Sequence, residues 1–254
     1  MDYQTDFEAN EETAPILRQF HSNYYLRINQ RRQEHLATLG LPLRNRTVWE
    51  VSAGIGDHTT FFLDRGCRVI TSDVRPELIA LLRQRFPHVP AQQIDLDAPP
   101  ETFTGSFEVV YAYGVLYHLR QPGPALAYLA SRCRNLLLLE TCVGYGDGQD
   151  ENPLEEPAQV ASQARSGQGC RPTRRFVWET LQNLFPYTYC PITQPAHEQF
   201  PLDWSQPWGK NELRRAVFIG SRERLVLPTL SAVLPSRHTP GDADYGKPGF
   251  LRRG

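Results

Sequence analysis

Long apolar runs, a secretory leader and a strong net charge are all missing from this 254-residue sequence. No apolar run approaches the roughly 20 residues that a helix needs to cross a bilayer. The first residues, Met1–Asp6, are acidic and lack the basic-then-apolar order of a signal peptide. The formal net charge is only −1, so no global field draws the chain to nucleic acid or to an anionic membrane. The sequence therefore predicts a cytoplasmic protein with no membrane partner, and it favours a small-molecule or sugar acceptor over a nucleic-acid partner.

Paired cysteines and metal-ligand spacings are missing as well. Five cysteines are present without any Cys-x-x-Cys pair, and they lie mostly in apolar surroundings, which predicts buried free thiols rather than disulfides. The histidines and acids at His118, His197, Glu198 and Asp203 do not have the spacing of a metal site. We therefore expect no metal.

The stretch that is most informative runs from Val48 to Gly56, Val-Trp-Glu-Val-Ser-Ala-Gly-Ile-Gly. A short apolar run predicts a buried parallel strand, and the small residues after it predict a tight turn before a helix. A dinucleotide site would place a third glycine in the first helical turn, where this sequence has Thr59. Glu50 at the end of the strand would repel a pyrophosphate and favour a cation. The pattern favours a zwitterionic sulfonium ligand over NAD.

The spacing Glu50-x-Ser52-x-Gly54-x-Gly56 resembles the acidic-x-Gly-x-Gly-x-Gly loop of class I S-adenosylmethionine (SAM) methyltransferases, with Ser52 in place of the first glycine. Further landmarks in the right order extend the resemblance over roughly residues 45–142. The resemblance implies SAM as the cofactor, held by these four residues. It also implies an α/β fold with a doubly wound, mostly parallel, seven-stranded Rossmann-like sheet.

Two acids follow predicted strands downstream of this loop. Asp73 ends the strand predicted over 67–73, where a carboxylate accepts from both ribose hydroxyls, although an N-cap or loop acid is the alternative. After the strand predicted over 89–94, the resemblance places an acceptor for the adenine amino group. Asp95 matches that place, with Asp97 as the alternative, and Leu96 between them is expected to contact the cofactor. Tyr113, at the end of the strand predicted over 107–113, is also expected to contact the cofactor.

The order of elements predicts ligands at one edge of the sheet. Five strands alternating with four helices place the carboxyl ends of the parallel strands together, and the acids and glycines above all fall at that edge. Two later strands, expected over 187–192 and 214–220, would complete the sheet in antiparallel fashion. We divide the chain into an N-terminal helical extension (1–43), a SAM-binding domain (44–221) with a lid insertion at 144–170, and an extended tail (222–254).

The N-terminal extension contains a helical pattern over 15–39. One interpretation is a helix packed on the edge of the sheet. The other is a helical cap over the cofactor, with Tyr24 and Tyr25 near the ligand.

His118 is the first candidate for a catalytic base. Methyl transfer to oxygen requires removal of a hydroxyl proton by a group that titrates near neutrality, which favours histidine. His118 lies just beyond the fourth strand, although it would also fit as a cap of the next helix or as part of the cavity wall. His197 is a second candidate on a later loop.

Three arginines cluster at a predicted helix start, near two tryptophans. Arg171, Arg174 and Arg175 are either solvated and paired with acids of the lid, or they hold an anionic or polyhydroxylated acceptor. In the second interpretation the acceptor stacks on Trp178 or Trp204.

Three functions remain open from the sequence. The first is O-methylation of a small polar metabolite or sugar. The second is modification of a wobble uridine in tRNA, because Gly114–His118 resembles the corresponding stretch of enzymes of that group. The third is SAM binding without catalysis, suggested only by Ser52. No feature of the sequence indicates an oligomeric state.

Overall fold

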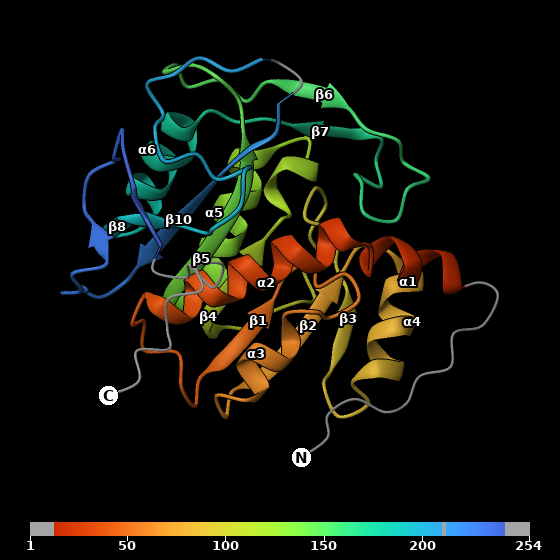
Figure 1. Cartoon of the computed structure of the whole chain (residues 1–254). Coiled ribbons are helices and arrows are strands. Elements are labelled where there is room, and N and C mark those ends of the chain that lie inside the picture. The colour runs from red at the N-terminus through yellow and green to blue at the C-terminus, as the bar shows by residue number, and fades with distance from the viewer. Residues whose placement is uncertain (1–12, 210–211, 242–254) are drawn as a thin grey trace, which may run out of the picture.

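A mostly parallel sheet forms the centre of the molecule (Figure 1). The computed structural model describes residues 13–209 and 212–241, and within these ranges eight strands join in this sheet. In order across the sheet the strands are β3 (Ala91–Gln93), β2 (Arg68–Asp73), β1 (Thr47–Glu50), β4 (Phe107–Tyr113), β5 (Cys133–Val143), β10 (Arg214–Ser221), β8 (Tyr187–Pro191) and β11 (Leu230–Ser231). The first five are parallel to one another, and β10 runs antiparallel to both β5 and β8. This arrangement confirms the predicted doubly wound fold, with eight described strands in place of the expected seven.

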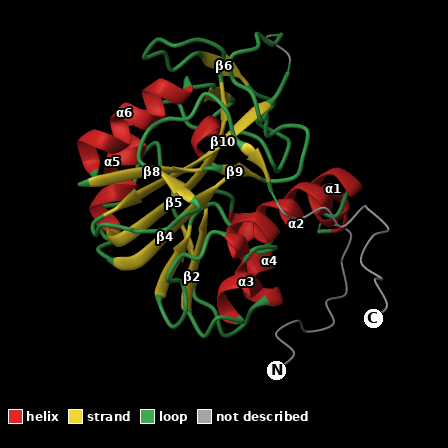
Figure 2. Cartoon of the chain, turned by 60° about the vertical axis from the view of Figure 1, so that its left-hand side comes forward, coloured by secondary structure: helices red, strands yellow, loops and turns green. Residues whose placement is uncertain are grey.

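Helices cover both faces of the sheet, as Figure 2 shows. Successive side chains of a strand point to opposite faces, so Trp49 packs with α5 and α6 while Val48 packs with α2, α3 and α4. The helices are α2 (Asn23–Thr38), α3 (Thr59–Leu63), α4 (Pro76–Arg85), α5 (Pro122–Arg132) and α6 (Arg174–Leu184). Because the inner strands are buried on both faces, they are apolar along their whole length, as the run Leu136–Leu139 on β5 illustrates.

The helical pattern over 15–39 forms two helices rather than the single one predicted. α1 (Ala14–Phe20) ends before Ser22, whose backbone is extended and whose hydroxyl accepts a hydrogen bond from the Tyr25 amide. Serine is a preferred N-cap residue, and this cap starts α2 in a new direction. Periodicity alone did not reveal the break because the apolar spacing continues across it.

The segment expected to be a lid without secondary structure contains a short antiparallel ribbon. β6 (Pro153–Glu155) pairs with β7 (Gln168–Cys170), and the intervening residues turn back toward the carboxyl ends of the parallel strands. Three-residue strands are too short to produce a detectable alternation in sequence. We call residues 157–167 the roof segment.

Part of the expected extended tail belongs to regular structure. β11 adds to the edge of the main sheet, and β12 (Thr239–Pro240) pairs with β9 (Thr193–Gln194). Residues 242–254, and Met1–Asp6 on which the expectation about a signal peptide rests, lie outside the described residues.

All five cysteines are free and buried, as predicted. Among the described helices, none is both long enough and apolar enough to cross a membrane.

Candidate active site

A cavity of about 300 Å³ opens at the carboxyl ends of β1, β2 and β4. Its floor is the turn after β1 together with the ends of β2 and β4, and α1, α2 and the roof segment enclose it from the other side. Gly56 of the predicted loop does not line the cavity. The predicted residues that do line it are Glu50, Ser52, Gly54, Asp73, Asp95, Leu96, Tyr113 and His118.

The turn after β1 has left-handed backbone at three places. Gly54 (φ 59°) and Gly56 (φ 84°) adopt conformations that glycine takes without strain. A Cβ on Gly56 would lie 2.5 Å from the Phe86 ring, so this glycine allows α4 to pack closely rather than a ligand to approach. Ser52 has φ 50° where the resembling family has glycine, so the turn keeps its shape with a serine.

Asp73 is held at the end of β2 by backbone donors. Its Oδ2 accepts from the Gly54 amide at 3.1 Å and its Oδ1 accepts from the Arg75 amide at 3.0 Å. Burial raises the pKa of Asp73 to about 6, although these amides act in the opposite direction. Each oxygen has a second lone pair, so the carboxylate is still able to accept hydrogen bonds from ligand hydroxyls.

Glu50 is buried at the end of β1. The Thr59 hydroxyl donates to its Oε2 at 2.6 Å, so the residue that replaces the third glycine of a dinucleotide loop orients this acid. Burial raises the pKa of Glu50 to about 8. The acid is therefore largely protonated at pH 7 in the free protein, and a bound cation would favour its ionised form.

Asp95 and Asp97 follow β3 but have different surroundings. Asp97 Oδ1 accepts from the Arg120 amide at 2.9 Å and so anchors the loop before α5. The Asp95 side chain is exposed at the cavity. Within the described part of the chain, it accepts a hydrogen bond only from the Asp97 amide, at 2.9 Å. Both acids line the cavity, and the Asp95 carboxylate has fewer hydrogen-bond donors within the described structure than that of Asp97.

A buried cation at the cavity was not predicted from the sequence. Arg32 Nη2 lies 2.6 Å from Glu140 Oε2, and Arg215 Nη1 lies 3.0 Å from Glu140 Oε1. Two guanidinium groups share one carboxylate, so the cluster keeps one positive charge in excess, and Arg32 lines the cavity. An acid at the end of the apolar strand β5 was the available signal, because a buried Glu needs cationic partners.

Two aromatic side chains complete this part of the wall. The Tyr113 hydroxyl is buried without a hydrogen-bond partner among the described residues, which leaves it available to a ligand. Tyr25 of α2 lines the cavity, whereas Tyr24 is more exposed and bonds to Gln199. Of the two tyrosines expected near the ligand, Tyr25 lines the cavity and Tyr24 does not.

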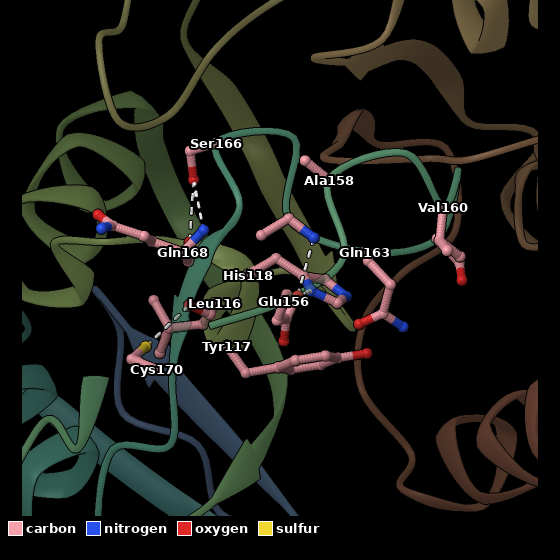
Figure 3. A network of polar contacts seen from close by, with 12 residues as sticks. Leu116, Tyr117, His118, Glu156, Ala158, Val160, Gln163, Ser166, Gln168 and Cys170 are labelled. Carbon is pink, nitrogen blue, oxygen red and sulfur yellow. Dashed lines mark hydrogen bonds and ion pairs between the residues drawn. The ribbon is translucent and has the colours of Figure 1, made fainter. Parts of the chain in front are cut away.

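His118 ends the short 3-10 helix η1 (Leu116–His118) and lines the cavity from the side of the roof segment. Its Nδ1 makes a short hydrogen bond to Glu156 Oε2, as drawn in Figure 3. Burial lowers the pKa of His118, and the bond to Glu156 partly opposes this effect. His118 is thus a neutral imidazole at pH 7, the form that a general base requires.

The cavity contains a second imidazole, His58, which is a weaker base. Burial lowers the pKa of His58 to about 3, and its Nδ1 bonds to the Tyr111 hydroxyl.

The side chains predicted to bind the acceptor lie away from the cavity. Arg171 bonds to Glu156, Arg174 stacks on Trp204 and bonds to the Pro235 carbonyl, and Arg175 pairs with Glu179. Trp178 is part of the core between the sheet and α5. All three arginines have partners within the protein, but only Arg171 pairs with an acid of the predicted lid.

His197, the second candidate base, also lies away from the cavity. Its side chain is buried, and burial together with nearby arginines lowers its pKa to about 4. Among the described residues, no group of three or more His, Cys, Asp or Glu side chains is arranged to hold a metal ion.

The roof segment is attached mainly by one arginine. Arg75 Nη2 donates to the carbonyls of Ala158, Val160 and Gln163 at 2.6, 3.0 and 3.2 Å. From the other side, Gln19 of α1 donates to the Ser162 hydroxyl. Arg75 thus links the roof segment to Asp73, because its side chain bonds to the roof and its backbone amide bonds to the Asp73 carboxylate.

A doubly wound sheet with a glycine turn after β1 and acids after β2 and β3 is typical of proteins that bind a nucleotide at the carboxyl ends of the strands. Residues 48–137 match the family model described as "Methyltransferase domain". This match agrees with the sequence resemblance to the class I SAM-dependent methyltransferases over these residues.

Curated relatives match part of the chain. The tRNA U34 carboxymethyltransferase of Shewanella putrefaciens is 36% identical over 113 residues, which are 42% of this chain and 34% of that protein. The enzyme of the same name from Shewanella loihica is 33% identical over 137 residues, 51% of this chain and 39% of that protein. The chain thus matches little more than a third of the length of these relatives.

A solved structure with the same fold is the N-terminal domain of EvdMO1 in the presence of S-adenosylhomocysteine (SAH) and D-fucose. The TM-score is 0.58 and the sequence identity is 17%, and the match covers 87% of this chain and 99% of that one. The same domain with SAH bound has a TM-score of 0.56 and 20% identity over 79% of this chain and 84% of that one. These similarities describe the fold.

Proposed function

We propose that this protein transfers a methyl group from SAM to an oxygen atom of a small polar acceptor, with His118 as the general base. The observation that carries the proposal is that the acidic strand ends, the glycine turn and a neutral imidazole line one cavity. The family match over 48–137 supports the class of reaction.

The residues of the cavity fit the cofactor group by group. Asp73 and Asp95 are free to accept from ribose hydroxyls and from the adenine amino group, respectively. Arg32 supplies excess positive charge for the amino-acid carboxylate, and Glu50 supplies a buried acid for a cationic group. The Tyr113 hydroxyl is a buried donor without a partner in the described structure. When bound, the cofactor supplies a methyl group on a positively charged sulfur.

The chain itself contributes positioning, exclusion of water and removal of a proton. Methyl transfer is an in-line displacement, so most of the catalytic effect comes from holding two reactants in line. α1, α2 and the roof segment enclose the cavity and reduce access of water. His118 takes the proton of the acceptor hydroxyl as the oxygen becomes methylated.

Enclosure by the roof favours a small acceptor or sugar over a macromolecule. A polymeric acceptor needs a broad surface of phosphate contacts, and the net charge of the chain is −1. Neither Arg174 nor Trp204 is needed to hold a small acceptor in this cavity, because neither lines it.

Calorimetry with SAH and with NAD tests the proposal directly, and mass spectrometry of ligands that co-purify with the protein tests it independently. We expect SAH to bind and NAD not to bind, and a second co-purified mass would identify the acceptor class. Preferential binding of NAD would overturn the proposal.

A second candidate function is modification of tRNA at a wobble uridine. It is favoured by the 36% identity over 113 residues to a tRNA U34 carboxymethyltransferase. The two functions differ in their dependence on salt, because the logarithm of RNA affinity falls with the logarithm of salt concentration with a slope of about −0.7 per phosphate contact. We expect no salt-dependent binding of bulk tRNA, and tight binding that weakens steeply with salt would favour the tRNA function.

A further inference from the structure

Glu156 connects the candidate base to the segment that encloses the cavity. It follows β6 and is 38 positions from His118 in the sequence, yet its carboxylate is almost completely buried against the imidazole. Figure 3 shows Glu156 beneath the His118 ring, with the roof segment passing above both residues.

Both oxygens of this carboxylate have fixed donors. Oε2 accepts from the Ala164 amide at 2.8 Å as well as from His118, and Oε1 accepts from Arg171 Nη1 at 3.2 Å. Burial acts to raise the pKa of Glu156, but the His118 bond, the Ala164 amide and Arg171 outweigh it and hold the pKa below its usual range. Glu156 is therefore an ionised acceptor that is already oriented.

An ionised acceptor at Nδ1 selects one tautomer of the imidazole. Nδ1 must carry the proton that Glu156 accepts, so Nε2 keeps a free lone pair. No hydrogen bond to Nε2 is found among the residues that the structure describes, and the ring borders the cavity. Nδ1 thus holds the ring through its bond to Glu156, and Nε2 is left to accept a proton.

We propose that Glu156 is a positioning residue that fixes the Nδ1–H tautomer of His118 and aims Nε2 at the hydroxyl of the methyl acceptor. This inference rests on the proposed function. As the acceptor oxygen bonds to the methyl carbon, the carbon–sulfur bond breaks and its electron pair stays on sulfur. The acceptor proton moves to Nε2, and Glu156 stabilises the resulting imidazolium without taking the Nδ1 proton.

The arrangement makes the base depend on the ribbon of β6 and β7. Arg171, immediately after β7, bonds to the Tyr117 carbonyl as well as to Glu156. A Cβ on Gly169 would lie only 2.5 Å from the Tyr117 carbonyl oxygen, so β7 packs directly against η1. The carboxylate reaches His118 only when the ribbon is packed in this way.

Nitrogen NMR of the His118 ring tests the inference without any knowledge of the acceptor. In the wild type with SAH bound, we expect Nδ1 to show the shift of a protonated nitrogen and Nε2 that of an unprotonated one. In Glu156→Gln the negative charge is lost, so the acid dissociation constant of His118 should rise by about tenfold or more. Arg171 and Arg215, the cations near the ring, remain in place in this variant. Their positive charges also lower the pKa of His118.

Glu155→Gln is the matched control, because Glu155 is the neighbouring carboxylate on the exposed side of β6. It should leave the tautomer and the titration of His118 unchanged. Glu156→Asp keeps the charge and should give a dissociation constant between those of the wild type and Glu156→Gln, which provides a second test if the glutamine variant does not fold.

The two proposals fail in different ways. If the wild type does not bind SAH, the proposed function is overturned. If SAH binds but Nε2 carries the proton, or if Glu156→Gln titrates like Glu155→Gln, the role of Glu156 is overturned while the function stands. Once an acceptor is known, Glu156→Gln should lower kcat by about tenfold or more, leave KM nearly unchanged and move the acidic limb of the pH profile to lower pH.

Discussion

The floor and the roof of the cavity are built in different ways. The floor consists of the ends of parallel strands, and backbone amides such as that of Gly54 hold Asp73 in place. The roof segment has one buried residue, Ala164, and its attachment depends on side chains, chiefly Arg75 and Glu156. Backbone pairing within a sheet is cooperative, whereas a segment held by a few side chains opens at lower free energy.

This difference separates two tasks. A floor that is part of the sheet gives the cofactor a fixed site. A roof held by a few polar contacts is suited to open and close around reactants. Glu156, which we propose orients His118, immediately precedes this segment. Changes in the floor should therefore alter cofactor affinity most strongly. Changes on the side of the roof should alter turnover, with a smaller effect on cofactor affinity.

The largest effect is expected at the candidate base. His118→Ala should lower kcat by roughly 10²–10⁴-fold, because that is the usual contribution of a general base. SAH affinity measured by calorimetry should be nearly unchanged. His88→Ala, which removes an exposed histidine, is the control and should keep full turnover. If His118→Ala keeps most of its turnover, the residue is only part of the cavity wall.

In the floor, Asp73→Asn should weaken SAH binding by about tenfold or more. The loss of a charged acceptor for hydroxyls costs about 1.5–3 kcal/mol. The control is Asp64→Asn, which makes the same substitution at an exposed acid after α3. This variant should bind SAH with the affinity of the wild type. Equal affinities of the two variants would remove Asp73 from the cofactor site.

The dependence of SAM affinity on pH tests the buried acid of the floor. Since the pKa of Glu50 is raised to about 8 in the free protein, a cationic ligand that needs the ionised form binds more tightly as pH rises toward that value. The expected increase between pH 7 and pH 8 is roughly fivefold. SAM itself titrates in this range, so the pH dependence of SAM affinity in Glu50→Gln is subtracted from that of the wild type. If the two pH dependences are equal, Glu50 does not bind the cationic group of the ligand.

The same shift predicts how stability depends on pH without ligand. The pKa of Glu50 is higher in the folded than in the unfolded state, so its contribution to stability is present at low pH. This contribution is lost as pH rises from the unfolded value of about 4.3 toward 8. Glu50→Gln should therefore flatten the decline in melting temperature over this range.

For the roof, Arg75→Gln should weaken SAH binding by at least roughly threefold, because hydrogen bonds contribute about 0.5–1.5 kcal/mol each. Hydrogen exchange of the amides in 158–163 should become faster at the same time. Arg83→Gln is the control, because it also removes a guanidinium bonded to a carbonyl, that of Ala91, at a place away from the roof. In this variant both SAH affinity and hydrogen exchange should stay unchanged. Unaltered exchange in Arg75→Gln would show that other contacts hold the roof.

The smallest effect concerns the turn after β1. Ser52→Gly should stabilise the protein by about 0.5 kcal/mol, because relief of the left-handed strain of about 1–2 kcal/mol exceeds the entropic cost of glycine of about 0.5–1 kcal/mol. Thermal unfolding measures this change. A loss of stability would mean that the Ser52 side chain makes a compensating contact.

The sequence alone determined the sheet and its active edge, because alternation, strand length and glycine spacing are local properties of the chain. The turn from Glu50 to Gly56, the end of β2 at Asp73 and the position of His118 after β4 were all predictable in this way. Only the tertiary structure brought Arg32 to Glu140, 108 positions away, and Glu156 to His118. It also showed that Arg174 stacks on Trp204 instead of facing the cavity. Such pairings depend on how elements far apart in the sequence are brought together across the sheet by the segments between them, and no periodic pattern records that path.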